Sequence, residues 1–175
     1  KDAHSAQANM ETVGISNTAD WQAVNRKEAA GTYSFDLVYR AKSLGRVDLK
    51  LLGMHNVANA LAAAAVAHAS GVKPRDICRY LGEYTGATRR LTWRGEVKGV
   101  TVVDDYAHHP TEIQATLAAA RPMGGRRLVI FQPHRYTRTA LLRDEFGGCF
   151  GDADRVWVLD VYGAGEAPVE GASAN

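Results

Sequence analysis

Residues 100–120 join a short apolar strand pattern to a helical pattern through a polar turn. The strand pattern ends near Val103, and Pro110 stands at the first position of the helical pattern. Between them, residues 104–109 carry two carboxylates, a tyrosine and two histidines. Open α/β sheets bind ligands where a strand meets a helix N-terminus, so we expect a buried strand followed by a binding or catalytic loop. The simpler alternative is an Asx-type turn that caps the helix, with solvated histidines.

After residue 88, strand patterns alternate with helical patterns, which predicts a parallel sheet connected by right-handed crossovers. Residues 163–175 are rich in Gly, Ala and Pro and have no period. We therefore assign residues 89–175 to a doubly wound, mostly parallel, Rossmann-like domain that is incomplete. The expected order is strand, strand, helix, strand, helix, strand, over residues 91–97, 99–104, 111–121, 127–132, 139–150 and 155–161.

The preceding part, residues 1–88, begins with weakly patterned polar sequence and then predicts a hairpin. Apolar residues alternate with polar ones over residues 32–40 and again over 47–51, as in antiparallel strands with one buried face. A turn is expected between them at residues 42–45. Before the hairpin, only residues 13–15 have the pattern of a short strand.

Two helices are expected next, at residues 57–70, ended by Gly71, and at residues 74–84. Asn56 and Asn59 lie three positions apart at the start of the first helix, so their amides share one face. A pair of carboxamides offers donors and acceptors that can read the edge of a purine. The alternative for Asn56 is the N-cap, a role that Asn favours.

The composition is that of a soluble globular protein, for which we expect a cytoplasmic location. The 21 Lys and Arg residues are balanced by 19 Asp and Glu, without a basic run, so nucleic-acid binding is not expected. Cys78 and Cys149 form neither a disulfide framework nor a metal pair. The sequence shows no signal-peptide pattern and no apolar run of membrane-spanning length. It starts without Met, so we expect a piece of a longer protein.

Arginines mark two further loops. Arg90 lies between the two halves, where a guanidinium can bind a phosphate bidentately, although adjacent arginines are usually only solvated. Residues 132–139 follow a predicted buried strand, and Arg135 and Arg138 of this loop can together clamp a carboxylate or a phosphate. Cations at a helix N-terminus oppose the helix dipole, which favours a ligand here over a plain basic helix start.

Two other patterns are weaker. His108, His109 and His134 lack the cysteine partners and the helical spacing of a zinc site, so we expect no metal ligands among them. Residues 160–166 contain glycines but match neither the phosphate loop nor the dinucleotide-binding turn, and no other stretch of the sequence supplies either motif.

Taken in order, these loops resemble those of the Mur ligases of peptidoglycan synthesis. The resemblance implies the end of a central ATPase domain in residues 1–88 and most of a C-terminal ligase domain in residues 89–175. It favours the branch of the family that adds L-alanine to UDP-N-acetylmuramate. A ligase that recycles a muramyl tripeptide, or a non-catalytic α/β module that binds a nucleotide or anion, are the alternatives. The resemblance is carried by residues 53–60, 86–90, 104–113, 132–139 and 161–168.

The resemblance also implies roles for individual residues. Asn56 and Asn59 match asparagines that lie against ATP. Arg90 matches an arginine of the ATP phosphate region, and Asp105 a carboxylate on the nucleotide. Together with His108, these last two are the residues expected to act in catalysis. Residues around the incoming amino acid and the muramyl substrate are matched by Tyr106, His108, His134, Arg135 and Arg138.

In the family's reaction, ATP and Mg²⁺ convert the muramyl carboxylate into an acyl phosphate, and the amine of alanine then attacks it. The family's UDP-binding domain, phosphate loop and magnesium ligands precede the matched runs and are not found in this sequence. The resemblance therefore implies that the 175-residue chain alone hydrolyses no ATP. The sequence does not indicate an oligomeric state.

Overall fold

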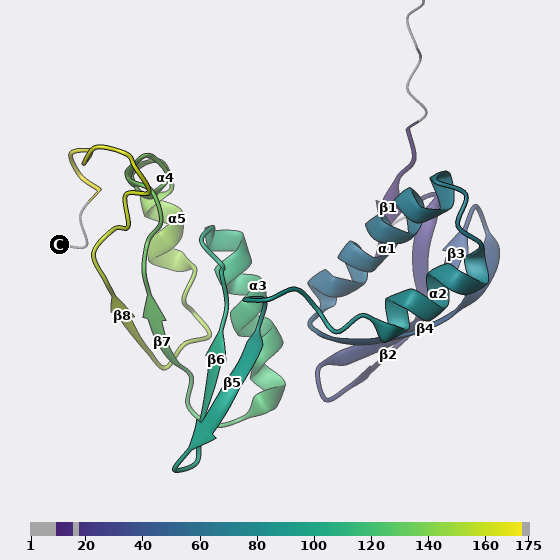
Figure 1. The fold of residues 1–175 in the computed structure, drawn as a ribbon, viewed down its shortest axis with the longest axis horizontal. Coiled ribbons are helices and arrows are strands. Elements are labelled where there is room, and N and C mark those ends of the chain that lie inside the picture. Colours follow the sequence, from purple (N-terminus) through teal and green to yellow (C-terminus); the bar gives the residue numbers. More distant parts are fainter. Residues whose placement is uncertain (1–9, 16–17, 173–175) are drawn as a thin grey trace, which may run out of the picture. The chain divides into compact units, whose positions relative to one another are not determined.

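The computed structural model describes residues 10–15 and 18–172, which fall into two compact units, Lys1–Thr85 and Gly86–Asn175. Figure 1 shows a mixed α/β arrangement in each of them. The units are described one at a time below.

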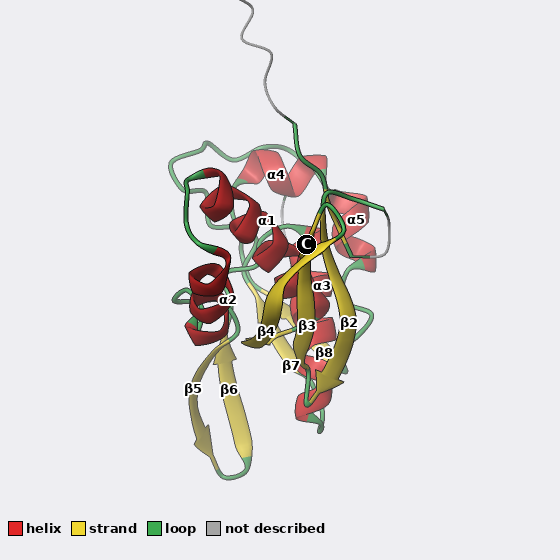
Figure 2. Ribbon diagram, turned by 90° about the vertical axis from the view of Figure 1, so that its right-hand side faces the viewer, coloured by secondary structure: helices red, strands yellow, loops and turns green. Residues whose placement is uncertain are grey.

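The first unit is a four-stranded sheet with two helices packed against it. The strands lie in the order β1-β2-β3-β4; β1 pairs parallel with β2, and the other pairs are antiparallel. Figure 2 shows the strands of this sheet in yellow with both helices beside it. Its elements are β1 (Val13–Gly14), β2 (Trp21–Ala29), β3 (Thr32–Tyr39), β4 (Lys42–Leu52), α1 (Met54–Ala69) and α2 (Pro74–Glu83).

One face of this sheet forms the core with the helices, because alternate strand residues point to the same side. Register pairs Ala23 with Leu37 and Phe35 with Val47, and all four are buried. The helices cover this face with further apolar side chains, so the core is continuous between sheet and helices. The fully or nearly fully buried members on the helices are Val57, Ala60, Leu61, Ala64 and Ile77.

The end of α1 confirms Gly71 as its terminating residue. Gly71 has φ of 84°, and its N–H donates to the carbonyl of His68 at 2.9 Å. The next N–H, of Val72, donates to the carbonyl of Ala67 at 3.0 Å. This pair of bonds is the Schellman motif, which satisfies carbonyls that the helix end would otherwise leave unpaired.

Three details of the first unit differ from expectation. β2 was not expected, because its second half is charged and exposed and a bulge between Val24 and Lys27 breaks its alternation. The β3–β4 turn lies at Arg40 and Ala41, which have φ of 45° and 64°, rather than at residues 42–45. Two left-handed residues make a tight hairpin turn, but Arg and Ala give no sequence signal for it. The helix α1 starts at Met54, three residues early.

The described part of the second unit contains two pairs of strands and three α-helices. β5 (Thr92–Val97) and β6 (Val100–Asp104) form an antiparallel hairpin, whereas β7 (Leu128–Phe131) and β8 (Arg155–Val158) pair in parallel. Between β6 and β7 lies α3 (Pro110–Ala120), followed by a 3₁₀ turn, Arg121–Met123. Two short helices, α4 (Tyr136–Leu141) and α5 (Arg143–Gly148), connect β7 to β8.

A smaller core holds α3, β7 and α5 together. Ile113 and Leu117 of α3 pack with Phe131 of β7 and with Cys149, and all four are buried. The α3 residues lie four positions apart and therefore on one face of the helix. Burial raises the pKa of the Cys149 thiol to about 11, so this cysteine is a packing residue and not a nucleophile.

The parallel β7–β8 crossover is confirmed, but the strands of this unit differ from expectation in other ways. In the described residues the hydrogen-bonded ladders are two separate pairs, and β5–β6 is antiparallel. The expectation of buried strands was wrong, because Val100 and Ile130 are 57% and 73% exposed. The helix expected at residues 139–150 is two helices that meet at Leu142, and β8 ends at Val158.

Candidate active site

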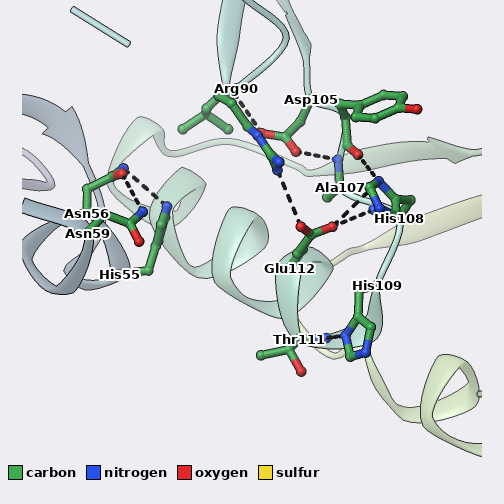
Figure 3. Close-up of polar contacts among 12 residues, drawn as sticks. His55, Asn56, Asn59, Arg90, Asp105, Ala107, His108, His109, Thr111 and Glu112 are labelled. Atoms are coloured by element: carbon green, nitrogen blue, oxygen red, sulfur yellow. Dashed lines mark hydrogen bonds and ion pairs between the residues drawn. The ribbon is translucent and has the colours of Figure 1, made fainter. Parts of the chain in front are cut away.

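The carboxylate of Asp105 holds the turn after β6 in place (Figure 3). Oδ1 of Asp105 accepts a hydrogen bond from the Ala107 N–H at 2.7 Å, and Oδ2 accepts one from the Leu91 N–H at 2.7 Å. The first bond closes an Asx-type turn, and the second fastens the loop to the start of β5. The alternative of an Asx turn is therefore correct for Asp105, although the two bonds leave further lone pairs on each oxygen.

The neighbouring Asp104 faces two arginines. Arg94 Nη2 donates to its Oδ2 at 2.8 Å, and Arg89 Nε lies 3.5 Å from the same oxygen. The hydrogen bond from Arg94, with the positive charge of both guanidinium groups, holds the pKa of Asp104 below its usual value. The guanidinium of Arg89 also lies over the ring of Tyr106, 4.8 Å from its centroid. Arg89 therefore contacts both Asp104 and Tyr106 of this loop.

Glu112 organises the start of α3. Its Oε2 accepts a hydrogen bond from the His108 N–H at 3.0 Å, and its Oε1 lies 3.6 Å from Nη1 of Arg90. Burial opposes its ionisation, but the hydrogen bond from His108 and the charges of His108 and Arg90 outweigh it and lower the pKa of Glu112. His109 is the N-cap, with its Nδ1 accepting from the Thr111 N–H at 3.2 Å. The arrangement differs from a capping box, because His109 accepts from the second helical residue and Glu112 accepts from the residue before the N-cap.

A cluster of four rings joins this loop to the loops after β7 and β8. Nδ1 of His108 lies 2.7 Å from the carbonyl oxygen of Tyr106, which can only accept, so this nitrogen carries the proton. The His134 ring is 5.9 Å from the His108 ring, 6.0 Å from the Tyr106 ring and 5.5 Å from the Tyr162 ring, measured between centroids. Three loops that are distant in the sequence therefore meet at one point.

The loop after β7 is held by the loop after β8. His134 forms an isolated parallel bridge with Tyr162, and the Arg135 N–H donates to the Tyr162 carbonyl at 2.8 Å. The carboxylate of Glu166 accepts hydrogen bonds from the N–H and the hydroxyl of Thr137, at 3.0 and 2.9 Å. It also lies 3.6 Å from Arg135 Nη1. The start of α4 is thereby fixed from outside its own segment.

Two buried polar atoms in this region have no hydrogen-bond partner, Nδ1 of His134 and Nη1 of Arg138. Leaving a buried polar group unpaired costs about 1–3 kcal/mol, and more when the group is charged. A ligand that pairs with both atoms recovers this cost. An anionic group suits the guanidinium, and an amine suits the imidazole nitrogen.

The electrostatic environment keeps His134 neutral. Burial disfavours the charged ring, and the positive charges of Arg138, His108 and Arg135 add to this effect, while Glu166 opposes it. The pKa of His134 is therefore lowered. A neutral imidazole retains a nitrogen that can accept a hydrogen bond or a proton, as an amine-binding position requires.

In the first unit, Asn56 and Asn59 contact each other near the start of α1 (Figure 3). Asn59 Nδ2 donates to Asn56 Oδ1 at 3.2 Å, and Asn56 Nδ2 donates to the Leu52 carbonyl at 2.8 Å and lies 3.1 Å from His55 Nε2. The N-cap is Gly53, so the capping alternative for Asn56 was wrong. The two amides share one helix face, as the spacing predicts, and Asn59 is exposed.

The structure thus brings together the predicted residues of the second unit: Arg90, Asp105, Tyr106, His108, His134, Arg135 and Arg138. Sequence reasoning missed Glu112, Tyr162 and Glu166. The position of Glu112, three residues after the N-cap, is a signal that could have identified it. Glu166 lies 29 residues from Thr137 in sequence, and no local pattern predicts that contact.

Among the described residues, no group of three or more His, Cys, Asp or Glu side chains is placed to hold a metal ion. None of the helices in that part of the chain is both long and apolar enough to cross a membrane.

Comparison with known proteins identifies this combination of two α/β units and polar loops. The model of the Mur ligase middle domain matches residues 1–67, and that of the Mur ligase glutamate ligase domain matches residues 89–175. The chain belongs to the Mur ligase family.

Within the family, the similarity is strong to one kind of enzyme. The chain is 48% identical to UDP-N-acetylmuramate–L-alanine ligases of Syntrophus aciditrophicus, over 165 residues, and of an Anaeromyxobacter species, over 166 residues. These matches cover 94% of this chain but only 34% and 36% of the relatives. The chain therefore spans about a third of the length of these curated relatives.

Solved structures agree with the fold. The crystal structure of UDP-N-acetylmuramate–alanine ligase from Thermotoga maritima has a TM-score of 0.70 and 29% identity, covering 87% of this chain and 34% of that one. A murein peptide ligase from Psychrobacter arcticus has a TM-score of 0.55 and 26% identity, covering 84% of this chain and 37% of that one.

Proposed function

We propose that this chain is part of an ATP-dependent ligase that adds L-alanine to UDP-N-acetylmuramate in peptidoglycan precursor synthesis. The observation that carries the proposal is the 48% identity, over 94% of the chain, to proteins named for that reaction. Residues 1–88 are then the end of the central ATP-binding domain, and residues 89–175 most of the C-terminal ligase domain. The substrates are small molecules, and we place the enzyme in the cytoplasm, where ATP is available.

The proposed reaction forms one amide bond and breaks one phosphoanhydride bond. The muramyl carboxylate attacks the γ-phosphorus of ATP and becomes an acyl phosphate, releasing ADP. The amine of alanine then attacks the acyl carbon and expels phosphate. Mg²⁺ neutralises phosphate charge in such a reaction, and we expect its ligands in a segment of the enzyme outside this chain.

The buried pair in the second unit fits the amino acid. We assign Arg138 to the carboxylate of alanine, because its Nη1 is buried without a partner in the structure. We assign His134 to the amine, because its Nδ1 is also unpartnered and its lowered pKa keeps the ring neutral. Tyr106 and His108 line the same cluster and are assigned to the amino acid and the muramyl substrate. Arg135 belongs to the same loop.

Four other predicted residues are assigned to the nucleotide: Asn56 and Asn59 to ATP, Arg90 to its phosphates and Asp105 to the nucleotide. Arg90 supports this assignment because its ion pair with Glu112 is half exposed and long, at 3.6 Å. Exposed pairs of this kind contribute about 0–1 kcal/mol, so a phosphate can replace the carboxylate as partner. Asp105, with Arg90 and His108, remains our choice for the catalytic group.

The experiment is a chimera. In the Syntrophus aciditrophicus relative, the matching segment is replaced by this chain, and phosphate release is measured with ATP, UDP-N-acetylmuramate and L-alanine. We expect alanine-dependent release, as for the unmodified relative, and no turnover by the 175-residue chain alone. Release that requires a tripeptide in place of alanine as the amine substrate would favour the recycling ligase. A folded chimera that binds nucleotide but releases no phosphate would favour the non-catalytic module.

A further inference from the structure

Glu166 ties together three groups at the start of α4. Its two oxygens accept from the Thr137 N–H at 3.0 Å and from the Thr137 hydroxyl at 2.9 Å, and Oε1 lies 3.6 Å from Arg135 Nη1. Only 22% of the Glu166 side chain is exposed, although it lies in a surface loop. These contacts hold its carboxylate ionised, and the hydrogen bond from the Thr137 N–H contributes most to its lowered pKa.

The segment that Glu166 holds is strained. Arg135 has φ of 74°, a left-handed conformation that costs a side-chain-bearing residue about 1–2 kcal/mol. Backbone bonds compensate: the Arg135 N–H donates to Tyr162 O, and the Tyr162 N–H donates to Pro133 O, both at 2.8 Å. Glu166 adds the side-chain contacts on the helical side of Arg135. The strain therefore persists only while the loop after β8 stays in place.

Close packing fixes the distance between the two loops. A Cβ added at Gly163 would lie 2.9 Å from Cε2 of Tyr136 and 3.0 Å from the Glu166 carbonyl oxygen. Real Cβ atoms do not approach other heavy atoms this closely, so only glycine lets the loop approach α4. The close approach at Gly163 and the contacts of Glu166 therefore both hold the start of α4.

Glu166 also makes the two arginines, Arg135 and Arg138, differ in their ion pairing. It pairs with Arg135, whereas Arg138 has no ion pair among the described residues and its Nη1 is buried without a partner. Because the carboxylate of Glu166 neutralises the guanidinium of Arg135, the guanidinium of Arg138 is the one that can bind an anionic ligand. His134, whose Nδ1 is likewise unpartnered, precedes Arg135 directly in the chain.

We propose that Glu166 is a positioning residue of the amino-acid site: it caps α4 through Thr137 and neutralises Arg135, so that Arg138 presents an unpaired guanidinium beside His134. The amino-acid role rests on the proposed function. Glu166 itself contacts no substrate in this scheme and acts through Arg138. Its loss therefore weakens binding of the amino acid selectively and leaves nucleotide binding intact.

The first test uses the 175-residue chain and does not depend on the identity of the ligand. Amide hydrogen exchange is measured in Glu166→Gln and in the control Glu170→Gln, an exposed glutamate of the same loop. We expect exchange at Thr137 to accelerate at least tenfold in Glu166→Gln alone, while the Ile113 amide of α3 is unchanged. Unchanged exchange at Thr137 overturns the positioning role. Gly163→Ala, which pushes the loop away from Tyr136, is expected to accelerate the same amide.

The second test uses the chimera and its apparent KM values. Glu166→Gln is expected to raise the KM for alanine at least fivefold and to change the KM for ATP less than twofold. If Glu166 acts through Arg138, adding Glu166→Gln to Arg138→Ala raises the KM for alanine no further. The proposal is overturned if the increases in the KM for alanine multiply in the double variant, or if Glu166→Gln lowers kcat alone. An unsubstituted chimera that ignores alanine overturns the proposed function, and with it the amino-acid role of Glu166, whatever the exchange at Thr137.

Discussion

The carboxylate of Asp105 accepts a hydrogen bond of 2.7 Å from the backbone N–H of Leu91. Leu91 has φ of 44°, which is uncommon for a residue with a branched side chain, so the bond stabilises an unfavourable backbone conformation. The other oxygen holds the Ala107 N–H in the turn after β6. A carboxylate that we assign to the nucleotide thus also organises the loop from which it extends.

Asp105→Asn is expected to loosen this loop. The amide keeps one acceptor oxygen, but its NH₂ group faces an N–H donor, and leaving that donor unpaired costs about 1–3 kcal/mol. Hydrogen exchange should accelerate at the Leu91 amide, at the Ala107 amide or at both. Asp160→Asn, at an exposed aspartate, is the control. Equal protection of both amides in Asp105→Asn would show that the carboxylate has no structural role.

Arg138→Ala is expected to raise the alanine requirement of the chimera at least tenfold, about 1.4 kcal/mol, because it removes the cation assigned to the amino-acid carboxylate. The measurement is phosphate release as a function of alanine concentration at saturating ATP. Arg126→Ala, at an exposed arginine, is the control and should leave the requirement unchanged. An unchanged alanine dependence in Arg138→Ala would reject the assignment.

The lowered pKa of His134 predicts a pH effect of defined sign. In the unfolded chain, the His134 imidazole takes up a proton near its ordinary pKa of about 6.5. In the folded chain, mainly burial disfavours the charged form of the ring, so the proton is taken up at lower pH. The unfolded state therefore binds more protons below that value, and stability falls as the pH drops through it, levelling off below the folded pKa. NMR titration of the imidazole should give a lower midpoint in the folded chain than in urea. Equal midpoints would contradict the burial argument.

Gly71→Ala should destabilise the first unit by about 1 kcal/mol, because an L-residue is strained at φ of 84°. No heavy atom lies within 4 Å of the added Cβ, so the cost comes from the backbone and not from a clash. The free energy of unfolding is measured from urea curves of Trp21 fluorescence, in a background that carries Trp93→Phe and Trp157→Phe. Gly71→Asn is the comparison and should lose less, since Asn tolerates this conformation. Equal losses in the two variants would point to the side chain instead.

Much of the fold follows from local sequence, because apolar periodicity and terminating residues act over a few positions. Pro110 starts α3 and Gly71 ends α1 as their chemistry requires. The polar loops after β6 and β7 were expected at strand ends, and the ring contact between Tyr106 and His134 joins them. Family resemblance supplied the roles, which residue pattern alone left open.

The remaining features depend on interactions that no short window contains. The left-handed conformations of Arg40, Leu91 and Arg135 are imposed by the segments around them, since none of these residue types favours such a backbone. Glu166 reaches Thr137 only after the chain has crossed from β7 to β8. The charged end of β2 lies outside the core, so the alternation of apolar residues stops before the strand ends.

The ties between the turn after β6 and the start of β5 have a mechanical consequence. The Tyr106 N–H donates to the Arg89 carbonyl at 2.8 Å, so with the Leu91 bond residues 89–91 move as part of the second unit. On the other side, the Tyr84 N–H is anchored to the last turn of α2. Residues 85–88, with Gly86 among them, connect these two anchored positions. Arg90, between the two bonded residues Arg89 and Leu91, is therefore fixed to the turn that carries Tyr106 and His108.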